Sequence, residues 1–158
     1  MSCDEQNAPA APRPREAGGS LDLQLRLPSD PRLLAVVRCT VAEFAAVCGF
    51  KDDQCRGITL AVDEALSNII RHAYKNRCDQ EIEMRLQASP ECLQVTFIDR
   101  GEPVDRSKCC AQPLDAVALG GRGTHLIRQI MDEVCYERVP GGNRLRLKKC
   151  LPQARPTP

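Results

Sequence analysis

The sequence predicts an α+β fold, a two-layer sandwich in which a mixed, mainly antiparallel sheet carries helices on one face. The predicted elements run strand, two helices, two strands, a long loop, helix and two strands. Strands in successive hairpins with helices grouped apart from them favour two layers. The length of 158 residues suits one domain. Aromatic residues make up only 3% of the chain, so we expect an aliphatic core.

The first half of the chain predicts one strand followed by a helix. The segment LDLQLRL, residues 21–27, alternates apolar and polar residues as a half-buried strand does. Ser29 or Asp30 can cap the next helix, and Pro31 suits its first turn. The apolar helical body that follows ends near Gly49, because glycine is common just beyond a helix terminus.

A second helix is predicted to open at Asp52 or Asp53 and to run to about Asn76. The turn Ser89-Pro90-Glu91 then separates two strands with β-rich composition. The remaining predicted elements are two strands, a helix and two strands, at residues 81–88, 92–99, 124–134, 135–139 and 144–149.

Three segments fall outside this pattern. Residues 1–20 are rich in proline, alanine and glycine, so we expect a disordered arm, and residues 151–158 read as a disordered tail. The folded domain is therefore predicted to span residues 21–150. Residues 100–122 lack a clear period, and so long a loop inside a compact domain is typically functional.

Charge and hydropathy exclude several classes of protein. The net charge is +1 with acids and bases intermixed, which gives no basic footprint for direct nucleic-acid binding. No stretch approaches the roughly 20 apolar residues that span a bilayer, and the first residues lack a secretory signal. We therefore expect a cytoplasmic protein that does not bind membranes.

The chain has ten cysteines but no Cys-x-x-Cys pair. The closest two are the adjacent Cys109 and Cys110, which make a poor start for a zinc site. We expect reduced packing and surface thiols in preference to metal sites or disulfides. Cys109 and Cys110 are the pair expected to be exposed, and sensitivity to oxidation there is a hypothesis.

A polar ladder marks the second helix. Glu64, Asn68 and His72 recur every four residues, a little over one helical turn, so they should project from the same side. Such groups are costly to bury without partners. The ladder is either a solvated stripe or one wall of a site.

Two further motifs follow in order along the chain. Asp99-x-Gly101-x-Pro103 comes directly after a strand, and the glycine-rich residues 120–123 lead into a helix. The first can be a simple turn, because glycine accepts positive φ and aspartate caps its own backbone. The second can be plain loop entry, yet bare N–H groups at a helix N-terminus also form an anion site.

Together the three motifs closely resemble the ATP-binding signature of the GHKL superfamily, and most nearly its bacterial anti-sigma-factor serine kinases. The quoted segments are EALSNIIRHAY, DRGEPVD and GGRGTHLIRQIMDEVCYE. The resemblance covers roughly residues 21–150 and implies the Bergerat fold, with the aperiodic residues 104–120 as an ATP lid.

The resemblance also implies roles for individual residues. Glu64 would be the general base, and Asn68 would hold Mg²⁺ against the ATP phosphates. Asp99 would accept a hydrogen bond from adenine, with Gly101 allowing the backbone to approach the base. His72 matches the motif, but we favour a structural hydrogen bond there. The other nucleotide-binding residues implied are Gly121, Arg122, Gly123 and Asn143.

Three positions need comment against the family pattern. Asn143 stands where many relatives carry threonine, and it can still donate and accept hydrogen bonds. His125 stands where a hydrophobic residue is common. Arg122 could reach a phosphate or be solvated.

The implied function is that of an ATP- and Mg²⁺-dependent serine protein kinase acting as an anti-sigma factor. It would phosphorylate a STAS-type anti-anti-sigma antagonist and sequester a sigma factor. The alternative is a nucleotide-gated protein-binding module of the same fold without significant kinase activity. The helix at residues 32–47 is a possible homodimer or partner surface, although its periodicity equally fits packing on the sheet.

Overall fold

The computed structural model describes residues 20–103 and 122–152. The predicted arm (apart from its last residue), the predicted lid and the last six residues of the tail lie outside these ranges. The elements, in chain order, are β1 Leu21–Pro28, the 3₁₀ turn η1 Pro31–Leu33, α1 Leu34–Val47, α2 Asp52–Asn68, the π-helical turn η2 Ile69–Ala73, β2 Glu81–Ala88, β3 Cys92–Asp99, α3 Arg122–Ile130, β4 Glu133–Val139 and β5 Gly142–Cys150.

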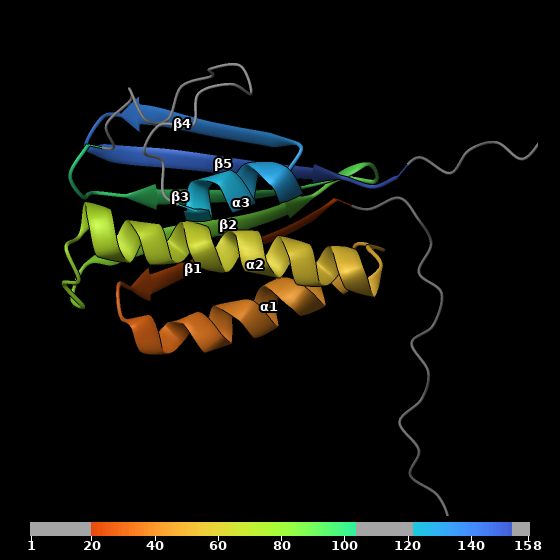
Figure 1. Cartoon of the computed structure of the whole chain (residues 1–158), viewed down its shortest axis with the longest axis horizontal. Coiled ribbons are helices and arrows are strands. Elements are labelled where there is room, and N and C mark those ends of the chain that lie inside the picture. Colours follow the sequence, from red (N-terminus) through yellow and green to blue (C-terminus); the bar gives the residue numbers. More distant parts are fainter. Residues whose placement is uncertain (1–19, 104–121, 153–158) are drawn as a thin grey trace, which may run out of the picture.

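The sheet has five strands in the order β1-β2-β3-β5-β4. Every strand pairing in the described ranges is antiparallel, so the mainly antiparallel prediction is confirmed and its mixed component is absent there. The three α-helices lie on one side of the sheet, with α2 between α1 and α3 (Figure 1). The two-layer prediction is therefore confirmed.

The core lies between this helical layer and the sheet. Alternate residues of β3, Leu93, Val95 and Phe97, are fully buried, because successive strand side chains point to opposite faces. Ile58 and Val62 of α2 meet the sheet four residues apart on one helical face. Polar side chains such as Glu83 and Arg85 of β2 lie on the open face of the sheet. This one-sided burial matches the alternation in the sequence.

The predicted caps are partly confirmed. The side chain of Asp30 accepts the Arg32 N–H at 2.9 Å and so caps η1, with Pro31 in the first turn as expected. The second helix begins at Asp52, but neither aspartate caps it. Instead the Gln54 side chain accepts the Lys51 N–H at 3.1 Å.

The predicted end of the second helix is wrong by several residues. Regular α-helix stops at Asn68, and η2 follows with a hydrogen bond from the Tyr74 N–H to the Ile69 carbonyl, five residues back. Lys75 and Asn76 then take positive φ values of 52° and 62°. Left-handed residues cannot continue a right-handed helix, so the helical segment ends before them.

The last helix and strands also shift from their predicted bounds. The helix starts two residues earlier than predicted and ends at Ile130 in place of 134. Asp132 is drawn away from helical pairing because its N–H donates to the Lys148 carbonyl at 2.9 Å. β5 is longer than predicted at both ends. Leu151, assigned to the tail, packs half-buried against the core.

Within the described ranges, no helix is both long and apolar enough to cross a membrane. The seven cysteines described there are all free thiols, as expected from the sequence.

Candidate nucleotide-binding site

Glu64 and Asn68 lie in the C-terminal half of α2, and both are half-buried. Their neighbours face elsewhere. Asp63 pairs with Arg38 of α1 at 3.0 Å, and Ser67 is buried. The helix therefore separates adjacent polar residues onto different faces, which agrees with the choice of Glu64 and Asn68 over Asp63 and Ser67.

His72 does not continue this stripe. It lies inside the π-helical turn, where each residue turns the chain by less than in an α-helix, so the four-residue spacing no longer keeps one face. Its side chain is exposed, and it forms no hydrogen bond with any residue in the described ranges. The structural hydrogen bond expected for His72 is thus absent among the described residues.

Glu64 lies directly against the start of α3. A methyl group built on Gly123 would come within 1.8 Å of Glu64 Oε1. Only a residue without a side chain leaves room there for the carboxylate. The contact brings the second half of α2 and the N-terminus of α3 together, and this joins two motifs that are far apart in the sequence.

Asp99, at the end of β3, is 4% exposed and anchors the turn that follows it. Its Oδ1 accepts the Gly101 N–H at 2.8 Å and the Asn143 amide at 2.8 Å. No donor in the described ranges reaches Oδ2, and that atom is not among the fully buried polar atoms without partners. One oxygen of this carboxylate therefore holds the turn, while the other has no hydrogen-bond donor among the described residues.

Burial raises the pKa of the Asp99 carboxyl above its usual value of 3.8. The hydrogen bonds from Asn143 and Gly101 and the positive charge of Arg138 act in the opposite direction. A buried carboxylate costs stability unless its partners compensate, so its presence at a strand end favours a functional role.

Asn143, 7% exposed, lies opposite Asp99 on β5. Its amide nitrogen donates to Asp99 and to the Glu102 carbonyl at 3.0 Å, and its Oδ1 accepts from Arg138 at 2.9 Å. The Arg138 contact fixes which way the amide faces, since only an oxygen can accept from a guanidinium. Asn143 thus positions Asp99 and its turn.

The Gly101 turn packs onto the end of η2. A side chain at Gly101 would lie 2.5 Å from the Ala73 carbonyl oxygen, so the close approach requires glycine. That carbonyl accepts the Glu102 N–H at 3.0 Å. The π-helical turn frees this carbonyl from helical pairing, and the ladder helix and the Asp99 turn are thereby joined.

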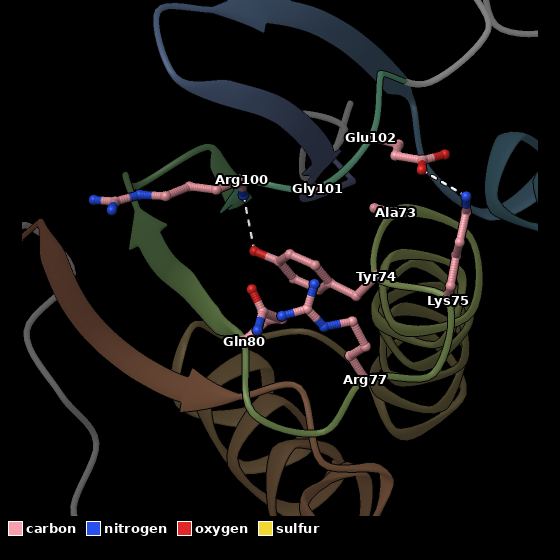
Figure 2. A pocket seen from close by; sticks show the side chains of 8 residues that line it. All are labelled: Ala73, Tyr74, Lys75, Arg77, Gln80, Arg100, Gly101 and Glu102. Carbon is pink, nitrogen blue, oxygen red and sulfur yellow. Dashed lines mark hydrogen bonds and ion pairs between the residues drawn. The ribbon is translucent and has the colours of Figure 1, made fainter.

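Tyr74, which the sequence motifs did not identify, makes a second connection between the helix end and the Asp99 turn. Its hydroxyl donates to the Glu81 carbonyl at 2.6 Å and accepts the Arg100 N–H at 2.8 Å. Figure 2 shows the contact between Tyr74 and Arg100 in a pocket beside the Gly101 turn, where the Lys75 ammonium also pairs with the Glu102 carboxylate at 2.6 Å. The sequence could have suggested this role, because a tyrosine at the end of an apolar helix is expected to be buried and a buried hydroxyl needs hydrogen-bond partners.

The remaining predicted site residues are only partly described. Gly121 and the predicted lid lie outside the described residues, and Arg122 is the first residue of α3. His125 is exposed on α3, which explains why a polar residue is tolerated there.

These residues fit a nucleotide with its metal. A side chain at Gly101 would meet the Ala73 backbone, and one at Gly123 would meet the Glu64 side chain. Asp99 presents a buried acceptor at the end of β3. The N-terminus of α3 offers bare N–H groups suited to phosphate. The described residues contain no cluster of three or more metal-binding side chains. Magnesium bound through phosphates and waters needs only one or two protein ligands, and Asn68 provides an amide oxygen.

The family model for the histidine kinase-like ATPase domain matches residues 27–149. The serine-protein kinase RsbW of Bacillus subtilis is 27% identical over 127 residues, which cover 75% of this chain and 79% of that protein. RsbW of Bacillus licheniformis is 26% identical over 141 residues, covering 84% and 88% respectively.

Two solved structures share the fold. The RsbU and RsbW domains of a Mycobacterium tuberculosis protein superpose with a TM-score of 0.61 at 18% identity, covering 84% of this chain but 33% of that one. The histidine kinase domain of a blue-light activated kinase from Erythrobacter litoralis gives a TM-score of 0.51 at 19% identity, covering 85% and 64%. The predicted resemblance to GHKL proteins and their anti-sigma-factor kinase branch is confirmed by these matches. Because the family model spans most of the chain, and the fold agrees, this chain belongs to the histidine kinase-like ATPase domain family.

Proposed function

We propose that this protein is an ATP- and Mg²⁺-dependent serine protein kinase that acts as an anti-sigma factor. The observation that carries the proposal is the contact between Glu64 of α2 and Gly123 at the start of α3. It sets a carboxylate beside a helix N-terminus suited to phosphate. The relatives named serine-protein kinase RsbW support the same activity.

The proposed roles are those that the family resemblance implies, and the described positions of Glu64, Asp99 and Gly123 support them. Asp99 accepts a hydrogen bond from the adenine amino group through Oδ2, the oxygen that does not bind the Gly101 N–H or the Asn143 amide. Asn68 holds the magnesium ion, and Gly121, Arg122 and Gly123 line the phosphates. The bound ATP and metal supply the phosphoryl group and neutralise its charge. Glu64 accepts the proton of the attacking serine hydroxyl.

The proposed partners are a STAS-type anti-anti-sigma protein that carries the target serine, and a sigma factor that is sequestered when the antagonist is modified. Such a role belongs in the cytoplasm. Val36 and Val47 of α1 and Leu60 of α2 are exposed at 57%, 42% and 49%. They support a partner or homodimer surface on the helical layer, which light scattering with and without each partner would test.

The first prediction separates the kinase from a nucleotide-gated binding module. We expect Glu64→Gln to keep ATP affinity while it slows phosphotransfer by roughly 10²–10⁴-fold, the usual contribution of a general base. Asn68→Ala should lose both Mg²⁺-dependent binding and transfer. The assay combines full-length protein, labelled ATP and antagonist proteins from the same genome, with calorimetry for binding.

Asp63→Asn is the matched control, because its side chain faces Arg38 and we expect normal transfer. Full transfer by Glu64→Gln would remove Glu64 from the mechanism. ATP binding without transfer to any antagonist by the parent protein would favour the binding module.

A further inference from the structure

Two cysteines 58 positions apart in the sequence lie side by side on neighbouring strands of the sheet. Cys92 opens β3 and Cys150 closes β5, and the strand register pairs them directly. Both side chains are half-buried. They lie on the open face of the sheet, since their neighbours Leu93 and Lys149 alternate to the opposite face. An oxidant in solution can therefore reach them.

The backbone hydrogen bonds identify the type of cross-strand pair. The adjacent pair is joined by a hydrogen bond from the Leu151 N–H to the Glu91 carbonyl at 2.7 Å. Bonded and non-bonded pairs alternate along an antiparallel ladder, so Cys92 and Cys150 form a non-hydrogen-bonded pair. In agreement, the Cys150 N–H donates to Asp132 at 2.7 Å.

Non-hydrogen-bonded pairs bring their Cα atoms to about 4.5 Å, which lies within the range that disulfides span. We propose that Cys92 and Cys150 form a dithiol site that peroxide oxidises to a cross-strand disulfide. This site lies apart from the candidate nucleotide-binding residues. It lies at the end of the sheet opposite Asp99 and Asn143, about 23 Å away along the strands.

The oxidation takes two steps at the sulfur atoms. A hydrogen bond with Cys150, together with burial, raises the pKa of the Cys92 thiol to about 11. In the first step one of the two thiols attacks the peroxide, the O–O bond breaks, and that cysteine becomes a sulfenic acid with release of one water. The thiol of the other cysteine then attacks that sulfur, forms the S–S bond and releases a second water.

The sequence allows a direct peptide-mapping test in the full chain. Trypsin cleavage after Arg85, Arg100 and Lys149 gives peptides 86–100 and 150–158, each with a single cysteine. After hydrogen peroxide treatment and blocking of free thiols, mass spectrometry without reductant should find these two peptides linked. Free thiols at both positions after other cysteines have been oxidised would overturn the proposal, as would linkage of either one to a different cysteine.

Thermal unfolding provides an independent measurement. The bond closes a long loop between β3 and β5, so the oxidised parent should unfold about 5–15 °C above the reduced protein. Cys92→Ser and Cys150→Ser should each abolish the increase. Cys135→Ser, on the same open face, should retain it. Identical melting of oxidised and reduced parent, or an equal increase in Cys150→Ser, would contradict the assignment.

Discussion

Asp99 combines two tasks that oppose each other energetically. One carboxylate oxygen accepts the Gly101 N–H and the Asn143 amide, and the other is the proposed acceptor for a ligand. Burial raises the pKa of this group, so the ionised form that binding needs is disfavoured in the fold. A hydrogen-bonded neutral group would be more stable at the same place, and the proposed recognition of adenine would account for a carboxylate there.

We therefore predict that Asp99→Asn preserves or increases stability at pH 7 while it weakens ATP binding. The pKa of Asp99 is higher in the folded than in the unfolded chain. Its contribution to the free energy of unfolding thus falls as pH rises from about 3.8 through the folded value, and the full penalty is present at neutral pH. An amide keeps an acceptor for Gly101 but presents a donor to the adenine amino group.

Melting curves from pH 4 to 8, paired with ATP calorimetry, measure both effects. Glu91→Gln, at an exposed turn, is the control that should change neither. A large loss of stability at pH 7 in Asp99→Asn would contradict the account of its burial.

The joint between α2 and the sheet depends on the π-helical turn η2. By ending the α-helix at Asn68, it releases the Ala73 carbonyl to bind the Glu102 N–H at 3.0 Å. It also places Tyr74 where its hydroxyl connects the start of β2 with the end of β3. The element that carries Glu64 and Asn68 is thus fixed to the turn that carries Asp99.

Tyr74→Phe tests this joint, because it keeps the ring and removes only the hydroxyl. We expect a loss of about 1–3 kcal/mol in the free energy of unfolding, since the Arg100 N–H and the Glu81 carbonyl both lose a partner. ATP affinity should fall as the turn loosens. Urea unfolding and calorimetry give the two values. Parent-like stability would show that the hydroxyl contributes nothing to the joint.

On the scale of the whole molecule, the candidate site links two of the helices with two inner strands of the sheet. Glu64 and Asn68 come from the middle helix, Asp99 and Asn143 from two central strands, and Gly123 from the last helix. A ligand that contacts these elements together binds the folded chain and not the unfolded one. Its binding free energy is therefore added to stability.

We predict that ATP or ADP with Mg²⁺, at a hundred times its dissociation constant, raises the melting temperature by about 5–10 °C. Asn68→Ala should lose the part of this increase that depends on Mg²⁺, whereas Asp63→Asn should keep it. Scanning calorimetry with and without a chelator separates the two contributions. An unchanged melting temperature at saturating nucleotide would reject the site.

Short-range patterns predicted most of the elements. The alternation in residues 21–27 and the β-rich composition of residues 92–99 gave strands that the structure confirms, and Asp30 caps η1 as expected. The bounds that failed were decided by distant partners. The third helix stops early because Asp132 pairs with β5, and no local pattern in the sequence reports that contact.

The residues of the candidate site likewise divide into those that local motifs identified and those whose contacts depend on strand pairing. The motifs identified Glu64, Asp99, Gly101 and Gly123, because each carries its chemistry or its missing side chain in a recognisable local spacing. They did not identify Arg138, which orients Asn143 from the neighbouring strand. A hydrogen bond of that kind depends on which strands pair, and that pairing was not predicted.

The sequence by itself determined which segments become strands and helices, that their apolar residues face one layer, and that three motifs belong to one nucleotide-binding family. Those properties depend on side chains within a few positions of one another. Only the tertiary structure decided that β5 lies between β3 and β4, that Cys92 faces Cys150, and that Glu64 rests on Gly123. These contacts join residues dozens of positions apart, and the packing of the whole core selects them.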